Sequence, residues 1–271
     1  YSLQACTFNH LFMFEECDAN PLLSPEDLTK LRSGINTLSY CCGATTFHLS
    51  SALGSVARGQ SAGRARHLKA LRVLIGYAYT MRFNCLCTPV PSWLEKVRKV
   101  TDMRVILEAD VDASLGSTQQ SGTDPFARQG YLMSVGVHRE VLGVCSGRTN
   151  LQTTIAVSTC EAEVTAVSFC ARALLGTKNM LSVLLPGASF EVPSLFGDNE
   201  ASNRLMAGQA SMRHMRHLRL PQVWARTCTA NGELRIYSKR SAENTSDMLT
   251  KVLSHQVISR LWRFMNVRAI Q

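Results

Sequence analysis

The sequence lacks any apolar run of the length that a transmembrane helix requires, and residues 1–10 show neither the basic nor the apolar segment of a secretion signal. These absences predict an intracellular protein without a membrane partner. An initiator Met is also missing, and we therefore expect a fragment of a longer polypeptide. No internal repeat and no low-complexity tract is present, which argues against a repeat architecture.

No two cysteines have the Cys-x-x-Cys spacing of a zinc site, and the pair Cys85 and Cys87 has no second half to complete one. Ten cysteines in 271 residues would suit a disulfide-rich protein, but Cys41 and Cys42 are adjacent and Cys170 lies among apolar residues. We therefore predict reduced thiols, most of them buried.

Acidic residues are scarce relative to basic ones. The chain has 20 Asp and Glu against 29 Lys and Arg, a formal net charge of +9 and a pI near 9.2. A basic surplus of this kind indicates a polyanionic partner such as a nucleic acid, although the charge alone is a weak indication. With 45% hydrophobic residues, the chain is long enough for one large or two small domains.

The first part of the chain shows a helical pattern. Ser24 and Pro25 suit a helix start, because the hydroxyl can cap the first turn and proline needs no amide hydrogen there. Apolar residues at helical spacing then predict helices over about 25–42, 47–57 and 65–79. Pro89 and Pro91 mark a linker. The sequence therefore predicts a small helical module over residues 1–92.

Residues 100–271 alternate strand and helix signals, which predicts an α/β domain with a mixed sheet. A meander of three strands comes first, followed by a long helix with two glutamates near its start. The remaining elements alternate. We predict strands over 105–114, 129–135, 141–145 and 233–238, a further strand that ends at Asn199, and helices after Glu161, over 200–207, over 213–227 and after Asn244.

Four carboxylates stand at the ends of these predicted elements: Asp112, Glu163, Asp198 and Asp247. Hard divalent cations such as Mg²⁺ prefer oxygen ligands, and a pair of such ions can assist phosphodiester hydrolysis. Because the chain has 20 acids, their placement alone is a moderate signal at best. Glu161 is better explained by the helix dipole, which favours negative charge in a first turn.

Several segments then resemble the ribonuclease H domain of Ty/copia-type retrotransposon polyproteins, in order and in wording. They are Val111-Asp-Ala-Ser-Leu-Gly116, Ile155-Ala-Val-Ser-Thr-Cys-Glu-Ala-Glu-Val-Thr-Ala-Val167, Phe196-Gly-Asp-Asn-Glu-Ala-Ser202, Arg216-His-Leu-Arg219, Gly232-Glu-Leu-Arg-Ile-Tyr237 and Ser246-Asp-Met-Leu-Thr-Lys251. The resemblance covers about residue 105 to the end. Residues 23–79 are similar to the tail of the family's reverse transcriptase.

The resemblance implies a ribonuclease H-like α/β fold, with a mixed five-stranded sheet flanked by helices and preceded by the helical module. It implies a ribonuclease H-like domain over 100–271, in which Asp112, Glu163, Asp198 and Asp247 are catalytic and hold two Mg²⁺ ions. Mn²⁺ would be able to substitute, and no small-molecule cofactor is expected. The substrate would be an RNA–DNA hybrid, and the upstream polymerase part of the polyprotein would be a partner. The location would be the cytoplasm, a virus-like particle or the nucleus.

The first catalytic segment leaves a choice of ligand. Asp110 and Asp112 lie on the same face of the predicted strand, and either could reach a metal ion. We favour Asp112, because Asp-Ala-Ser resembles the family motif and lies nearer the strand end. Asp110 is the alternative. A simpler interpretation is that both carboxylates face water at a strand end.

The basic cluster at residues 213–219 predicts contact with the phosphates of a nucleic-acid duplex. An alternative interpretation is a solvated charged face of a helix. Lys239 and Arg240 would extend the basic surface. The predicted substrate-binding residues are Arg213, Arg216, His217, Arg219, Arg148 and Asn199.

Three positions depart from the family pattern. Leu115 and Val144 stand where tryptophans are common, and Pro221 falls inside the predicted basic helix, which it should bend or break. These changes affect packing and substrate contact rather than the four acids. They leave open an alternative function, a catalytically silent nucleic-acid-binding remnant of a retrotransposon polyprotein.

Overall fold

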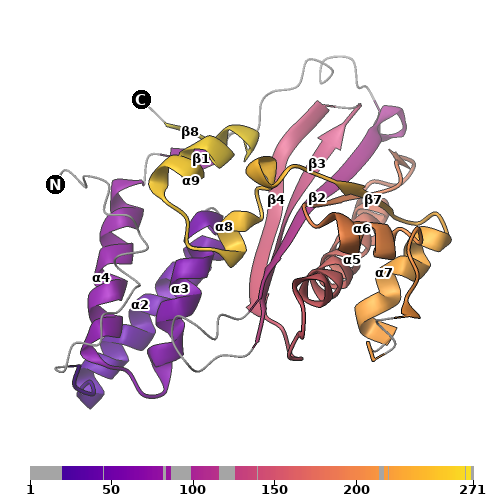
Figure 1. Cartoon of the computed structure of the whole chain (residues 1–271). Helices are drawn as coiled ribbons and strands as arrows, with labels where there is room; N and C mark the ends of the chain where they lie inside the picture. The colour runs from indigo at the N-terminus through magenta and orange to yellow at the C-terminus, as the bar shows by residue number, and fades with distance from the viewer. Residues whose placement is uncertain are drawn as a thin grey trace. The chain divides into compact units, whose positions relative to one another are not determined.

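The computed structural model describes residues 20–44, 46–81, 84–86, 99–115, 126–138, 140–213, 217–218, 220–265 and 267–269. The chain divides into two compact units (Figure 1). Unit 1 comprises Tyr1–Leu86 together with Met248–Gln271, and unit 2 comprises Cys87–Asp247. Unit 1 is therefore built from two separate stretches of chain.

Three helices form the centre of unit 1: α2 (Pro25–Ala44), α3 (Ser50–Ala57) and α4 (Ala65–Thr80). The predicted cap is present, because the Asp27 amide donates to Ser24 Oγ at 3.1 Å. Leucines at helical spacing fill the space between these helices, with Leu31 and Leu74 fully buried. The three helices predicted from the sequence are thus confirmed within a few residues of their ends.

The end of the chain completes unit 1. Strand β1 (Asn84–Leu86) pairs in antiparallel fashion with β8 (Val267–Ala269), and helix α9 (His255–Trp262) brings aromatic rings to α4. Tyr77 Oη lies 3.3 Å from His255 Nδ1, and the His48 ring meets those of Tyr77 and Trp262 edge to face. Burial, with a smaller effect of the His255 charge, lowers the pKa of His48 to about 4.

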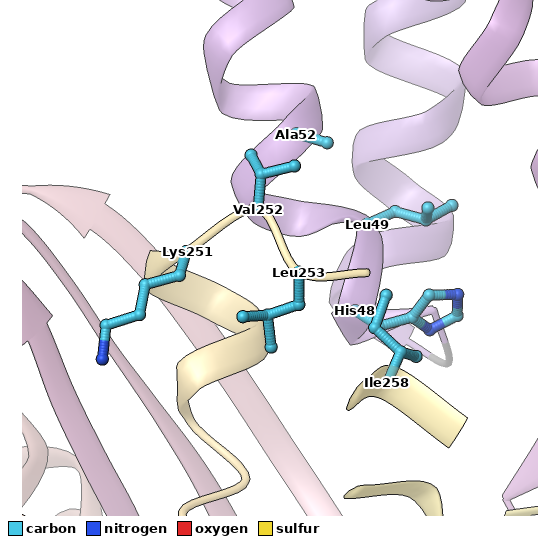
Figure 2. A pocket seen from close by; sticks show the side chains of 7 residues that line it. All are labelled: His48, Leu49, Ala52, Lys251, Val252, Leu253 and Ile258. Carbon is cyan, nitrogen blue, oxygen red and sulfur yellow. The ribbon is translucent and has the colours of Figure 1, made fainter. Parts of the chain in front are cut away.

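A small, mostly apolar pocket lies beside this aromatic group. Figure 2 shows the seven side chains that line it, which come from Leu49, Ala52 and His48 and from the later residues Lys251, Val252, Leu253 and Ile258. Apart from His48 and Lys251, its lining residues carry no polar side chain. The pocket therefore has the character of a packing gap rather than of a reaction site.

Unit 2 is organised around a mixed sheet in the order β4-β3-β2-β6-β7 (Figure 1). Strands β2 (Arg104–Ser114), β3 (Arg128–Val137) and β4 (Glu140–Leu151) form an antiparallel meander. Strands β6 (Ser194–Gly197) and β7 (Arg235–Ser238) run parallel to β2, and a sixth, two-residue strand, β5 (Ser189–Phe190), pairs with the start of β2. β2 thus lies at the centre of the sheet.

Helix α5 (Thr159–Leu184) packs against β2 and β3 and contributes the largest single share of the apolar core of unit 2. Its buried face includes Val164, Val167, Ala171 and Leu174, at the helical spacing that the sequence predicts. Helices α6 (Glu200–Met206) and α7 (Leu220–Ala230) pack against α5 and against each other. The predicted fold class, a mixed sheet flanked by helices, is confirmed. The strand count differs from the predicted five only through the two-residue β5.

Two local predictions need correction. The basic stretch at 213–219 does not form the first half of a helix among its described residues, because α7 begins at Leu220. Pro221 therefore lies in the first helical turn, where its missing amide hydrogen breaks no bond. The predicted closing helix after Asn244 is divided into α8 (Asp247–Thr250) and α9.

The units do not follow the predicted domains in one respect: residues 248–271 group with unit 1 rather than with the preceding sheet. The division into domains 1–92 and 100–271 stays a prediction, and the prolines of its linker lie outside the described residues. Within the described part of the chain, no helix combines the length and the apolar character needed to cross a membrane.

Candidate metal centre

The strand register explains why two of the predicted acids meet. Val111 on β2 pairs with Gly197 on the parallel strand β6, so that Asp112 and Asp198 follow directly at the same edge of the sheet. Carboxyl ends of parallel strands commonly carry functional groups for this reason. Asp112 is 1% exposed, and Asp198 is partly exposed.

The third acid comes from the start of α5. Ser158 caps this helix by accepting the Glu161 amide at 3.2 Å, and Glu161 Oε2 accepts the Val157 amide at 3.0 Å. Glu161 thus has the helix-start role predicted for it, and its Oε2 also lies 3.4 Å from His217 Nε2. Glu163, two residues on, points to a different face of the helix and is 5% exposed.

Asp112, Glu163 and Asp198 each bring one carboxylate oxygen into a group in which all of these atoms lie within 4.8 Å of one another. Three carboxylates this close repel each other, and a divalent cation among them would offset that repulsion. The Glu163 carboxylate also acts on the neighbouring Cys160. Burial and, to a smaller extent, the charge of Glu163 raise the pKa of the Cys160 thiol. An all-oxygen donor set suits a hard divalent cation.

Asp110 does not join this group. Its buried carboxylate lies 2.7 and 2.8 Å from Lys239 Nζ and accepts hydrogen bonds from the amide and the hydroxyl of Thr245 at 3.1 and 2.5 Å. The structure therefore separates the two aspartates that the sequence left as alternatives. Asp112 faces the other acids, whereas Asp110 is engaged with a lysine and a threonine.

Asp247, the fourth predicted ligand, is the first residue of α8 and is partly exposed. It lies outside the group formed by the other three acids. Its backbone amide donates to the Asn244 carbonyl at 3.4 Å. The structure thus places Asp247 directly after a turn, and its role as a ligand stays a prediction.

Comparison with known proteins shows a relative by sequence. The chain is 24% identical over 221 residues to the Retrovirus-related Pol polyprotein from transposon TNT 1-94 of Nicotiana tabacum, an alignment that covers 82% of this chain and 15% of the relative. This chain is related to retrotransposon Pol polyproteins. The predicted resemblance to a retrotransposon Pol polyprotein is thereby confirmed, whereas the copia type stays a prediction. The chain spans only 15% of the relative's length. No family model matches.

Similar solved structures include RNase H1 from the halophilic archaeon Halobacterium salinarum NRC-1, at 14% identity and a TM-score of 0.35, over 58% of this chain and 98% of that one. Another is the Prototype Foamy Virus Protease-Reverse Transcriptase, at 13% identity and a TM-score of 0.29, over 61% of this chain and 21% of that one.

The structure describes four of the six predicted substrate-binding residues. Arg216 and Arg219 lie outside the described residues. Arg213 is exposed, and the Arg148 guanidinium lies 5.8 Å from the centre of the Phe169 ring. Asn199 caps α6 by accepting the Ser202 amide at 3.0 Å, which explains its position without a substrate.

Sequence reasoning missed the polar residues that follow β7 in this Pol-related chain. Ser241 Oγ donates to Asp198 Oδ2 at 2.7 Å, and Asn244 Nδ2 donates to the Val111 carbonyl at 3.0 Å. Lys239 was predicted to extend a basic surface, yet its ammonium is paired with Asp110. No local pattern marks these contacts, because the partners are 43 to 133 residues apart in the chain.

Proposed function

We propose that this chain is a metal-dependent endonuclease that hydrolyses the RNA strand of RNA–DNA hybrids during reverse transcription of a copia-type retroelement. The observation that carries the proposal is the group of Asp112, Glu163 and Asp198. Each contributes one carboxylate oxygen, and these oxygens lie within 4.8 Å of one another. The relation to a retrotransposon Pol polyprotein supports the biological setting.

The three acids fit a divalent cation by their chemistry. They offer oxygen donors, two of them are buried, and their mutual repulsion gives the site a strong preference for positive charge. Asp112, Glu163 and Asp198 would hold Mg²⁺, or Mn²⁺ in its place, and Asp247 would contribute from the start of α8. A bound divalent ion would supply an activated water and would stabilise the leaving oxygen of the phosphodiester.

The chain's own residues would hold the substrate in place. Arg148 and Arg213 are exposed cations of unit 2 that can contact phosphates, and Arg216 and Arg219 would add to them. His217 Nε2 lies 3.4 Å from Glu161 Oε2 on α5, and this contact would orient its imidazole for binding the substrate. Such contacts recognise the shape and the 2′-hydroxyls of a hybrid rather than its sequence.

The experiment is cleavage of an end-labelled RNA strand in an RNA–DNA hybrid with Mg²⁺ or Mn²⁺, with EDTA as the metal-free control. The variants are Asp198→Asn and, as a matched control away from the acids, Asp102→Asn, whose carboxylate accepts the Lys99 amide at an exposed 3₁₀ turn. We expect metal-dependent cleavage by the wild type and by Asp102→Asn. We expect a loss of about 100-fold or more in Asp198→Asn, since even outer-shell changes at metal sites cost about 10–100-fold.

The same experiment distinguishes the nuclease from the alternative function, a silent nucleic-acid-binding remnant. A folded wild-type chain that binds the hybrid but does not cut it with either metal would establish the silent nucleic-acid-binding remnant. Cleavage that persists in EDTA or in Asp198→Asn would contradict the assignment of the acids.

A further inference from the structure

The chain between β7 and α8 is fastened to the two central strands at several points. The Lys239 amide donates to the Gly197 carbonyl at 2.9 Å, and Ser241 Oγ donates to Asp198. Asn244 Nδ2 donates to the Val111 carbonyl, and Thr245 donates twice to Asp110. We call residues 239–246 the anchoring segment. It touches β2 and β6 at the residues that adjoin the metal centre.

The last three residues of the anchoring segment are almost completely buried. Asn244 and Ser246 are 0% exposed and Thr245 is 5% exposed. Asn244 Oδ1 accepts both the amide and the hydroxyl of Ser246 at 3.2 and 2.6 Å, which closes a tight turn. Asp247 follows directly, so its position depends on how firmly this turn is held.

Asp110 is the charged anchor of the turn. A buried carboxylate is costly unless it is paired and hydrogen-bonded, and Asp110 meets both conditions through Lys239 and Thr245. Lys239 Nζ also lies 5.7 Å from the centre of the Phe196 ring on β6, which orients the ammonium further. Charge-assisted hydrogen bonds of this kind are stronger than neutral ones.

We infer that Asp110, Lys239 and Thr245 form a positioning group that fixes the anchoring segment and, with it, the carboxylate of Asp247 at the metal centre. Asp110 is therefore a positioning residue and not a ligand, although it lies two residues from Asp112 on the same strand face. This inference rests on the proposed function in assigning Asp247 to the metal centre, but the anchoring itself does not.

The test uses the full chain with four variants and one control variant. Asp110→Asn removes the charge, Lys239→Met and Thr245→Val remove its two partners with little change of size, and Asp112→Asn removes a proposed ligand. Glu243→Gln is the matched control, because Glu243 lies in the same segment and its side chain forms no hydrogen bond or ion pair within the described part of the chain. Circular dichroism and thermal unfolding confirm that each variant is folded.

Hydrogen exchange of the amides of residues 244–247 tests the anchoring without any metal. We expect exchange to rise at least about tenfold in Asp110→Asn, Lys239→Met and Thr245→Val, and to stay unchanged in Glu243→Gln and Asp112→Asn. Unchanged protection in the first three variants would overturn the inference, whatever the outcome for hybrid cleavage.

Binding of Mn²⁺, measured by calorimetry, tests positioning against ligation. We expect Asp110→Asn, Lys239→Met and Thr245→Val to weaken Mn²⁺ binding alike, by about tenfold, as outer-shell changes do. We expect Asp112→Asn to lose binding far more completely. If Asp110→Asn lost binding as completely as Asp112→Asn while Lys239→Met and Thr245→Val bound normally, Asp110 would be a ligand and the inference would be wrong.

The two proposals fail in different ways. A wild-type chain that shows no hybrid cleavage, with the exchange results as expected, would contradict the nuclease and leave the anchoring established. Cleavage by the wild type, with no change of exchange or Mn²⁺ affinity in the three anchoring variants, would contradict the positioning group and leave the nuclease established.

Discussion

Glu161 and His217 are in contact, with 3.4 Å between Oε2 and Nε2, whereas Glu163 on the same helix belongs to the acid group. Two glutamates only two residues apart thus have different partners. We predict that Glu163→Gln weakens Mn²⁺ binding by about 100-fold or more, since it removes one of the three carboxylates of the acid group. Glu161→Gln should keep Mn²⁺ affinity within about threefold, because Glu161 contacts a histidine and a backbone amide.

Calorimetric titration of both glutamate variants with Mn²⁺ makes this comparison. The two variants remove the same charge from positions two residues apart in one helix, so each is the matched control of the other. Equal loss of affinity would show that the charge of the region, rather than the geometry of the group, determines binding.

Gly197 is the last residue of β6 and leaves no room for a side chain. A Cβ at this position would lie 2.6 Å from Asn203 Oδ1, and Asn203 Nδ2 donates to the Gly197 carbonyl at 2.8 Å. We predict that Gly197→Ala destabilises the fold by roughly 1–3 kcal/mol through overpacking. Because Asp198 follows directly, the substitution should also weaken Mn²⁺ binding.

Urea unfolding of Gly197→Ala checks this prediction, with Gly176→Ala as the control. Gly176 lies in the middle of α5, and no atom lies within 4 Å of a Cβ built there. The same chemical change at Gly176 should stabilise the helix by about 0.5–1 kcal/mol. A Gly197→Ala variant as stable as the wild type would show that Asn203 can move at little cost.

Arg148 offers a separate test of substrate contact, since it is exposed and is held over the Phe169 ring. If Arg148 contacts a phosphate of the hybrid, Arg148→Ala should weaken binding and reduce the slope of log affinity against log salt concentration by roughly one. Arg104→Ala removes the same charge from unit 2 but breaks an ion pair with Glu191 at 2.8 Å. Fluorescence anisotropy over a salt series should therefore show no change of slope for Arg104→Ala.

The members of the acid group could be predicted from the sequence because the segments around them resemble those of a known family, and their places at strand ends and at a helix start add a weaker local signal. The anchoring segment could not, since Lys239 and Asp110 meet only through tertiary structure across 129 residues of chain. Pro221 was misjudged for a physical reason: a proline forbids a helix interior but suits a first turn, and the sequence alone did not locate that turn. The partner of β1, strand β8, was likewise too distant in the chain to predict.

Unit 1 has its own pH dependence, through His48. Because burial lowers the pKa of His48 to about 4, the folded state resists protonation that the unfolded chain accepts below pH 6.5. The unfolded state therefore binds more protons between about pH 6.5 and 4, and the stability of unit 1 falls as pH decreases through that window. We predict a loss of roughly 1–3 kcal/mol between pH 7.5 and pH 4.5.

Trp262 is a local reporter for this effect, since its ring lies 5.2 Å from that of His48. Its fluorescence during urea unfolding, in a chain in which Trp93 and Trp224 are replaced by Phe, follows unit 1. His48→Phe keeps an aromatic ring in place and should flatten the pH dependence. A dependence that survives in His48→Phe would show that it does not come from His48.

The return of the chain to unit 1 after Asp247 has a consequence for the order of events during translation. Every residue of unit 2 emerges from the ribosome before α9 and β8, whereas α2, α3 and α4 emerge first and must wait for those last elements. His48 and Tyr77 lack their Trp262 and His255 neighbours until then. Unit 2 can therefore fold before unit 1 is complete, and a stop codon just after Asp247 would remove α9 and β8 from unit 1 while leaving the sheet of unit 2 whole.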